Sequence, residues 1–333
     1  MGWTRTGRPG AVTFLTARAD RRKDPLAERA AIANRALDYA SMNDVREGRL
    51  VRPDGRTVAW SESGVENGRP VFRLPGTPGS RFSLRHDQGP WVERGLRVIT
   101  VERPGFGAST RLRGRGFAEH ADDLAAILDH LGIARLPVYG GSGAAPHILA
   151  FAGRHPDRVA ACTIGSGAAP LTDEEVHEQV DSNVIADGLA RQGDADGLRV
   201  VLGEARTAIL ADPLAGFRAL LDTAPPADQE IMADPAWQAA HARGICEALA
   251  PGVDGWVDEV LAIDGDWHDV DLASVTCSVT WWHSTADRNC PLSSAQRIVG
   301  RLPNARLIVE EGGGHLMADD GEGTLLDELL ARA

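Results

Sequence analysis

Cysteine is scarce in this sequence and long apolar runs are missing, and each shortage excludes a class of protein. The four cysteines of the 333-residue chain, Cys162, Cys246, Cys277 and Cys290, lie far apart and lack the spacing of a zinc site or a small disulfide framework. No apolar run approaches the roughly 18 residues of a membrane-spanning helix. We therefore expect a cytoplasmic protein with reduced thiols that does not act in a membrane.

Positive charge is also in short supply. The chain has 35 basic and 47 acidic residues, a formal net charge of -12 and a sequence pI of about 5.3. Binding to nucleic acid requires clustered positive charge, so nucleic acid is not an expected partner. Hydrophobic residues (43%) and charged residues (25%) occur in ordinary proportions, which is typical of a globular domain that acts on a small molecule. Nothing in the pattern indicates an oligomeric state.

The N-terminal segment 1–47 differs from the rest of the chain. Residues 1–23 are rich in Gly, Arg and Thr without any periodic pattern, so we expect a tail. Asp24 and Pro25 are residue types favoured at a helix N-terminus, and the apolar residues over 26–40 fall on one helical face. The segment is therefore predicted to be a tail followed by an appended helix.

From residue 48 onward, short apolar strands alternate with helical patterns. A hairpin opens this region, and a helix predicted over 117–131 places its apolar residues on one face, as a helix that covers a sheet should. This alternation predicts an α/β fold with a mostly parallel, doubly wound sheet. The predicted strands cover residues 50–52, 57–61, 71–74, 96–101, 136–139, 159–164, 279–282 and 307–310.

One connection in this alternation is much longer than the others. After residue 169, roughly a hundred residues carry helical patterns with polar breaks, whereas ordinary connections are about 2 to 6 residues long. We predict a helical lid, or cap, over residues 171–270, inserted above the carboxyl ends of the strands. The catalytic core then consists of residues 48–170 and 271–333. The helical patterns of the insertion cover residues 173–190, 198–210 and 235–249.

The strongest local signal is a serine between small residues, where a predicted strand runs into a helix. Gly140 and Ala144 stand two residues before and after Ser142, as a nucleophile elbow requires for steric reasons. The N–H of Gly143, at the start of the helix, would then face a developing oxyanion. An ordinary Gly-rich turn has the same composition, so the assignment depends on partner residues. The competing Ser166 has Ile164 two positions before it, which does not fit an elbow.

A serine nucleophile needs a base and an acid that orients the base. His315 follows three glycines on a loop after the last predicted strand, and those glycines permit a close approach to Ser142. Asp287 lies on the loop after the preceding strand, whereas the loop after the strand that carries Cys162 has only Ser, Gly, Ala and Pro. The chain order of serine, aspartate and histidine predicts a triad of Ser142, Asp287 and His315.

Two further motifs complete a resemblance to a known family. The loop after the strand at 71–74 reads Gly76-Thr77-Pro78-Gly79, and residues 103–107 read Arg-Pro-Gly-Phe-Gly. From about residue 48 onward, the chain resembles the α/β-hydrolase fold family. It is similar to the serine hydrolases with a Gly-x-Pro-Gly oxyanion loop, such as proline iminopeptidases and esterases. The resemblance implies that the N–H of Thr77 joins that of Gly143 in the oxyanion hole, and that the Thr77-Pro78 bond is cis.

The sequence departs from the family pattern at two positions. Pro75 precedes Gly76 where the family usually has a histidine, which affects the geometry of the oxyanion loop. Glu102 stands before Arg103 where an aspartate is usual. Because the usual histidine is a supporting residue, we expect activity to be retained.

These residues predict hydrolysis of an ester, lactone or amide bond through an acyl-enzyme, without a metal or organic cofactor. Serine at the elbow argues against epoxide hydrolase or haloalkane dehalogenase chemistry, for which related enzymes use aspartate. A non-catalytic binding protein that keeps the pocket is one alternative, suggested by Pro75. Proline iminopeptidase activity is another, since the start of the lid is acidic and could hold a substrate ammonium group. Such a run also occurs as the solvated face of a helix. It comprises Asp173, Glu174, Glu175, Glu178 and Asp181.

Contacts to substrate can be predicted only from position. Gly76 belongs to the oxyanion loop, and Ser166 lies at the hinge where the chain enters the lid. Trp237, Trp256 and Trp267 lie in the lid and its hinge, where each is a candidate either for the pocket wall or for the core of the lid.

Overall fold

The computed structural model describes residues 15–17, 45–214, 224–265, 267–316 and 319–333. The helix predicted over 26–40 lies outside the described residues. Within the segment predicted as a tail, Leu15–Ala17 forms a short strand, β1, which pairs in parallel with the last strand, β9. Part of the N-terminal segment therefore extends the edge of the sheet.

Nine strands form one sheet among the described residues, in the order β1-β9-β8-β7-β6-β4-β5-β3-β2. Strand β3 pairs antiparallel with β2 and β5, and the other pairs are parallel. The predicted α/β fold with a mostly parallel sheet is therefore confirmed. Besides β1, the strands are β2 (Arg46–Val51), β3 (Thr57–Gly64), β4 (Arg69–Leu74), β5 (Leu96–Val101), β6 (Leu136–Gly141), β7 (Val159–Gly165), β8 (Ser278–Ser284) and β9 (Ala305–Glu310).

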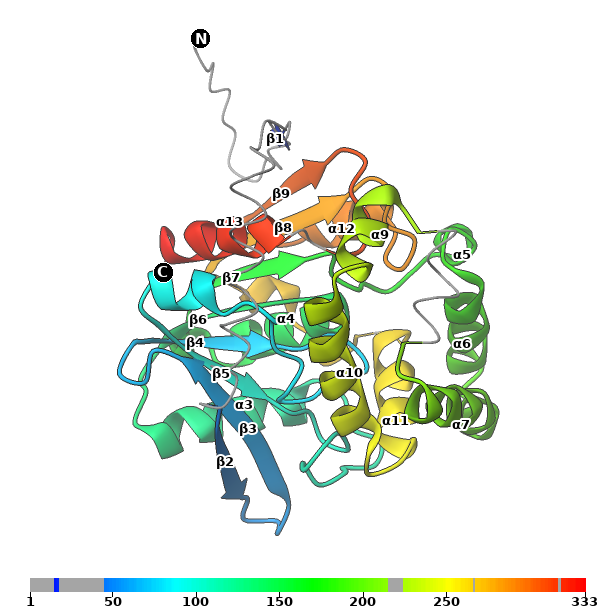
Figure 1. Ribbon diagram of the computed structural model, residues 1–333, viewed down its shortest axis with the longest axis horizontal. Coiled ribbons are helices and arrows are strands. Elements are labelled where there is room, and N and C mark those ends of the chain that lie inside the picture. Colours follow the sequence, from blue (N-terminus) through cyan, green and yellow to red (C-terminus); the bar gives the residue numbers. More distant parts are fainter. Residues whose placement is uncertain (1–14, 18–44, 215–223, 266, 317–318) are drawn as a thin grey trace.

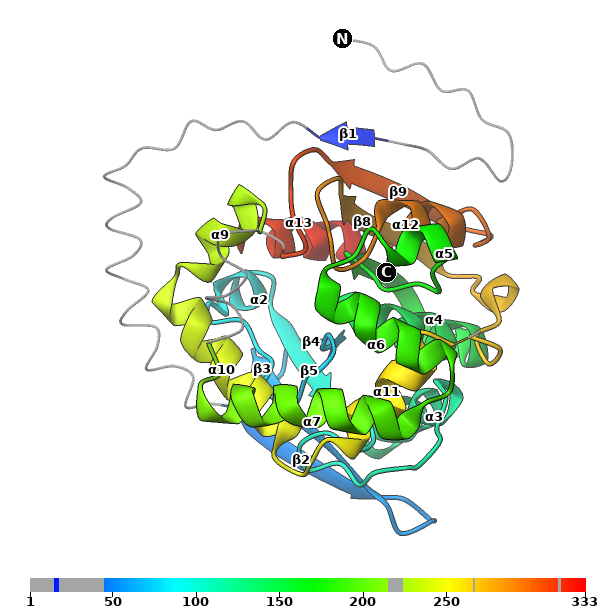
Figure 2. The same ribbon diagram turned by 90° about the vertical axis from the view of Figure 1, so that its right-hand side faces the viewer.

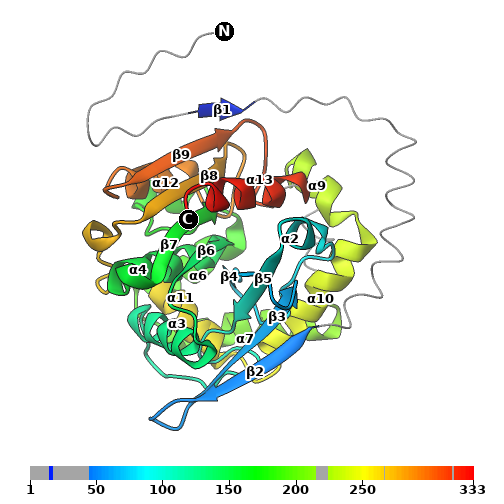
Figure 3. The same ribbon diagram turned by 90° about the vertical axis from the view of Figure 1, so that its left-hand side faces the viewer.

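Helices cover both faces of the sheet, which explains why its central strands are apolar on both sides. On one face, Phe72 and Val138 belong to a core shared with α3, α4 and α12. On the other face, Val71 and Tyr139 pack with residues of α2 and α13. Figure 3 shows the sheet between these two groups of helices. The helices are α2 (Gly89–Glu93), α3 (Ala118–Leu131), α4 (Ala145–Arg154), α12 (Leu292–Val299) and α13 (Asp319–Leu330).

A helical insertion separates β7 from β8 in the chain. Its helices gather beyond the carboxyl ends of the parallel strands (Figures 1 and 2). Leu198 and Leu202 of the insertion pack on Val257 and Val260, so the insertion has an apolar core of its own. Its helices are α5 (Asp173–Val176), α6 (Asp181–Arg191), α7 (Ala195–Ala211), α9 (Pro226–Met232), α10 (Pro235–Leu249) and α11 (Asp254–Ile263).

The structure corrects one helix of the insertion. A continuous helix over 173–190 was predicted, but α5 ends at Val176 and α6 begins at Asp181. Val180 between them is extended, and its N–H donates to the carbonyl of Arg288 on the loop after β8. A tertiary hydrogen bond thus replaces an intrahelical one at this point. In the described part of the insertion, the sequence patterns did not reveal α9 and α11.

Candidate active site

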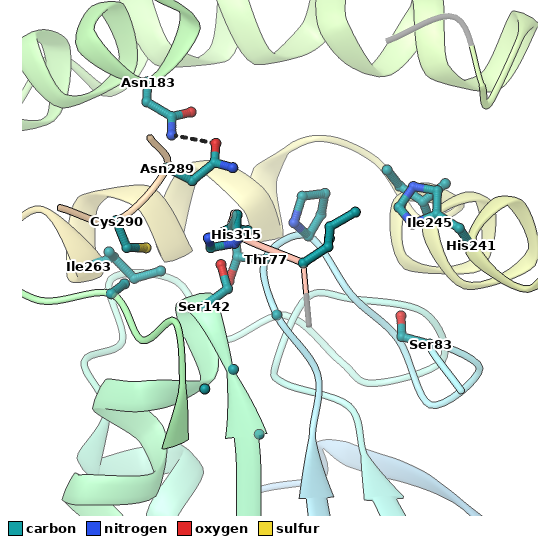
Figure 4. A pocket seen from close by; sticks show the side chains of 18 of the residues that line it. Thr77, Ser83, Ser142, Asn183, His241, Ile245, Ile263, Asn289, Cys290 and His315 are labelled. Atoms are coloured by element: carbon teal, nitrogen blue, oxygen red, sulfur yellow. Dashed lines mark hydrogen bonds between the residues drawn. The ribbon is translucent and has the colours of Figure 1, made fainter. Parts of the chain in front are cut away.

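A cavity of about 780 Å³ is lined both by residues at the carboxyl ends of the strands and by residues of the helical insertion. Ser142, His315, Thr77 and Gly143 all line it. Figure 4 shows the side chains of Ser142 and His315 next to each other at the floor of this cavity, below residues of the insertion. The structure therefore brings together residues that the sequence places on three separate loops.

Ser142 occupies a sharp turn between β6 and α4. Its φ of 55° lies in the left-handed region, which costs free energy for a non-glycine residue and is typical of functional sites. The neighbouring backbones leave no room for larger residues before it. A Cβ on Gly140 would lie 2.4 Å from the carbonyl oxygen of Leu74, and one on Gly141 would lie 2.6 Å from that of Gly165. The small residues predicted for steric reasons are required by two adjacent strands.

His315 and Asp287 are hydrogen-bonded to each other. Nδ1 of His315 lies 2.9 Å from Oδ2 of Asp287. The N–H groups of Asn289 and Cys290 also donate to Asp287, at 2.8 and 2.9 Å, so its carboxylate is held in place. Because Nδ1 of His315 is hydrogen-bonded to Asp287, Nε2 of His315 is the nitrogen that can contact a reacting group.

The charges of this pair shift both pKa values. Burial raises the pKa of Asp287, but His315 outweighs burial, and the pKa lies below its ordinary value. Burial lowers the pKa of His315, but Asp287 outweighs it with a contribution from Asp228, and the pKa lies above 6.5. The pair is thus arranged to stabilise a protonated imidazole.

Asp228, in helix α9, holds the loop of His315 from the side of the insertion. Its two carboxylate oxygens each accept one backbone N–H, from His315 and from Leu316, both at 2.9 Å. The side chain is buried, and burial raises its pKa above the ordinary value. Sequence reasoning missed this residue, because one aspartate in the first turn of a helix is indistinguishable from a solvated one.

The loop predicted to form the oxyanion hole is held by Arg103. This guanidinium donates to the carbonyl oxygens of Pro75 and Gly76 at 2.5 and 2.7 Å, and to Oγ1 of Thr77 at 3.0 Å. The Thr77-Pro78 bond is cis. Gly143 lies directly against this loop, since a Cβ there would be 2.2 Å from Oγ1 of Thr77. The two predicted donors are therefore neighbours, and Arg103 supports a loop that has Pro75 where the family usually has histidine.

Behind this loop lies a fully buried group of charged side chains. Glu259 of helix α11 accepts from Oγ1 of Thr77 at 2.9 Å and pairs with Nε of Arg103 at 2.9 Å and with Arg115. Burial raises the pKa of Glu259, but the two arginines outweigh it and hold the pKa well below 4.5. His147 also contacts Glu259, at 3.1 Å, yet burial lowers the pKa of His147 to about 4, so it is neutral. Sequence reasoning identified neither Glu259 nor His147.

Glu102, the other departure from the family pattern, is also buried, and both of its carboxylate oxygens accept hydrogen bonds. Its carboxylate accepts from the guanidinium and backbone of Arg81, at 2.7 and 3.1 Å, and from the N–H of Ala108 at 2.8 Å. The longer side chain therefore serves as an anchor between loops.

The predicted substrate contacts divide into two groups. Gly76, Trp237 and Trp256 line the cavity. Ser166 and Trp267 are not among the described residues that line it, which corrects their assignment. Ser166 is buried behind the nucleophile turn, where its carbonyl accepts the N–H of Ser142. Trp267 packs on Phe117 in the main core, at 5.8 Å between ring centres.

The acidic residues at the start of the insertion do not reach the cavity either. Asp173 is exposed and pairs with Arg191, and Glu175 caps α5 and pairs with Arg297. Glu174 and Glu178 are exposed, and none of these four lines the cavity within the part of the chain that the structure describes. The predicted ammonium site is therefore wrong for these four residues.

None of the His, Cys, Asp and Glu side chains of the described residues form a group of three or more that could hold a metal ion. Among the helices described, none is long and apolar enough to cross a membrane.

Comparisons with known proteins agree with this architecture. The sequence profile of a family described as "alpha/beta hydrolase fold" matches residues 69–322. A non-heme haloperoxidase of Rhodococcus erythropolis is 27% identical over 285 residues, 84% of this chain and 96% of the relative. A probable proline iminopeptidase of Leptolyngbya boryana is 31% identical over 127 residues, 36% of this chain and 38% of the relative.

Solved structures show the same fold. A thermophilic esterase from Thermogutta terrifontis superposes with a TM-score of 0.59 at 19% identity, over 86% of this chain and 98% of the esterase. The enol-lactonase from Burkholderia xenovorans LB400 superposes with a TM-score of 0.61 at 18% identity, over 85% of this chain and 100% of the lactonase.

Proposed function

Since the chain belongs to the alpha/beta hydrolase fold family, we propose that it is a serine hydrolase that cleaves an ester, lactone or amide bond of a small molecule. The observation that carries this proposal is one cavity in which Ser142, on a strained turn, lies beside a His315 that is hydrogen-bonded to Asp287. The names of the relatives, which include hydrolases of several substrates, agree with this class of reaction.

In the proposed reaction, Oγ of Ser142 attacks the substrate carbonyl carbon while Nε2 of His315 takes the hydroxyl proton. Asp287 orients the ring through Nδ1–H and stabilises its positive charge. The tetrahedral oxyanion accepts hydrogen bonds from the N–H groups of Thr77 and Gly143. Loss of one such donor typically raises the barrier by about 2.7 to 4 kcal/mol.

Collapse of the tetrahedral species breaks the bond to the alcohol or amine, which leaves with the proton from His315. Water then enters, gives its proton to His315 and attacks the acyl-Ser142 carbonyl. A second collapse releases the carboxylic acid and returns the proton to Ser142. These reaction steps require only residues of this chain and water.

A fluorophosphonate probe tests the nucleophile directly. We expect covalent labelling of the wild-type protein at Ser142 and none of Ser142→Ala. Ser166→Ala, which removes the hydroxyl of the competing serine, should still be labelled. If the wild type is not labelled, the serine hydrolase proposal is wrong and the non-catalytic binding protein is favoured. If Ser142→Ala is labelled equally, Ser142 is not the nucleophile and the proposal is also wrong.

A substrate panel then separates the bond types. We expect turnover of p-nitrophenyl esters or lactones. In the p-nitrophenyl esters, p-nitrophenolate leaves without needing a proton from His315. Aminoacyl p-nitroanilides represent the alternative, proline iminopeptidase activity. Turnover of the anilides alone would overturn the ester assignment.

A further inference from the structure

One side of the cavity consists of polar residues that present hydrogen-bond acceptors. We call Gln179, Asn183, Asp264 and Asn289 the acceptor arm; all four line the cavity. Nε2 of Gln179 donates to the carbonyl of Asn289 at 3.0 Å, and Nδ2 of Asn183 donates to its side-chain oxygen at 3.3 Å (Figure 4). These bonds use amide N–H groups, and Oε1 of Gln179 is left buried without a donor. The acceptor arm therefore contains at least one acceptor oxygen that lacks a donor.

Asp264, at the end of helix α11, places a carboxyl group in this arm. Among the described residues, no hydrogen bond or ion pair reaches that carboxyl group. Burial and the neighbouring carboxylate of Asp187 raise its pKa to about 7, and Arg191 only partly offsets them. A carboxylate that lacks a partner in such surroundings is stabilised by any cation that binds beside it.

Two neighbours of Asp264, Cys290 and Ile263, also face the cavity that contains Ser142. Cys290 lines the cavity, and burial raises the pKa of its thiol, with smaller contributions from the charges of Asp287 and Asp264. Ile263, the residue before Asp264, has its Cδ1 3.1 Å from where a Cβ on Gly143 would lie. Asp264 therefore belongs to the wall of the same cavity that Ser142 and Gly143 line.

The basic residues of the cavity wall do not neutralise Asp264. Arg73 and Arg85 pair with Glu322, at 3.8 and 3.0 Å. Arg288 is exposed, and no ion pair joins it to Asp264 in the described part of the chain. Arg73 and Arg85 thus have a counter-charge of their own, and no ion pair among the described residues neutralises Asp264.

We propose that Asp264 and the acceptor arm bind a primary ammonium group of the substrate while Ser142 attacks a carbonyl nearby. The proposal rests on the proposed hydrolase function and names its substrate class. The ammonium group donates to the carboxylate of Asp264 and to Oε1 of Gln179. A neutral substrate of the same shape leaves both groups without a partner, and the site discriminates against it for that reason.

Matched ester pairs test this specificity. The p-nitrophenyl esters of glycine, 3-aminopropanoic acid and 6-aminohexanoic acid are compared with those of propanoic, butanoic and heptanoic acid, in which a methyl group replaces the ammonium group. We expect at least one pair to show a kcat/KM about tenfold or more higher for the ammonium ester at pH 8. In Asp264→Asn that ratio should fall to near one. Asp196→Asn, an exposed carboxylate elsewhere in the insertion, should keep the wild-type ratio.

A second measurement uses the wild-type protein alone. Butylammonium should slow fluorophosphonate labelling of Ser142 at concentrations at which butan-1-ol has no effect, and more strongly at pH 8 than at pH 6. Equal protection by both compounds, or an ester preference that survives in Asp264→Asn, would overturn the proposal. A protein that labels at Ser142 and turns over the neutral esters with no ammonium preference refutes only this inference. A protein that neither labels nor turns over any ester refutes the proposed function.

Discussion

The hydroxyl group of Thr77 donates a hydrogen bond of 2.9 Å to the carboxylate of Glu259, which lies 182 positions further along the chain. The first belongs to the predicted oxyanion loop and the second to the helical insertion. Glu259 also pairs with Arg103, which holds the carbonyls of Pro75 and Gly76. The insertion therefore supports the loop from behind, in a chain that lacks the usual histidine at position 75.

Glu259→Gln should both destabilise the protein and reduce its activity. The change leaves the buried guanidinium groups of Arg103 and Arg115 without a counter-charge, a defect that typically costs about 3 to 5 kcal/mol. Displacement of Thr77 should lower kcat/KM by up to about 100-fold. Urea unfolding and ester hydrolysis measure the two effects. Asp254→Asn, on the same helix but half exposed, should change the free energy of unfolding by less than about 1 kcal/mol.

Asp287→Asn should lower kcat by about four orders of magnitude, because an asparagine favours the wrong tautomer of His315 and does not stabilise its positive charge. The fold should persist, as judged by circular dichroism and thermal unfolding. Asp173→Asn removes an exposed carboxylate and should leave kcat unchanged. An Asp287→Asn variant that retains more than a tenth of the wild-type kcat would show that another group orients the base.

Activity should fall as the pH is lowered, with a midpoint above pH 6.5. His315 acts as a base only when it is neutral, and Asp287 and Asp228 raise its pKa above the ordinary value. As the pH falls, His315 therefore becomes protonated, and stops acting as a base, at a higher pH than an unperturbed histidine would. The measurement is kcat/KM for a neutral ester between pH 5 and 9, and a midpoint at or below 6.5 contradicts the expectation.

Asp228→Asn should shift that acid limb to lower pH. The variant removes one negative charge beside His315, so the imidazole loses its proton more readily. It also has one acceptor oxygen for the two N–H groups of His315 and Leu316, and the looser loop should lower kcat by about 10- to 100-fold. Asp194→Asn, at the N-terminus of α7, should change neither quantity, since asparagine also caps a helix. A lower kcat without a shift of the limb would indicate that Asp228 is only structural.

The sequence alone predicted most strands of the sheet and the turn at Ser142, because apolar runs and small residues are visible in it. Apolar runs specify strands that are buried on both faces, and the glycines before Ser142 are needed because neighbouring strands leave no room for a Cβ. Asp287 and His315 were predicted as a pair because the loops that follow adjacent parallel strands emerge at the same edge of a sheet. The structure places the two side chains in hydrogen-bonding contact.

Only the tertiary structure decided which residues of the insertion matter. Asp228, Glu259 and Asp264 are single carboxylates on helices, and nothing in their local sequence distinguishes them from Asp173 or Glu174, which face solvent. Their roles depend on contacts with loops far away in the chain and on the water that packing removes. Burial and long-range partners set the pKa of a carboxylate, and neither is a property of the neighbouring residues in the sequence.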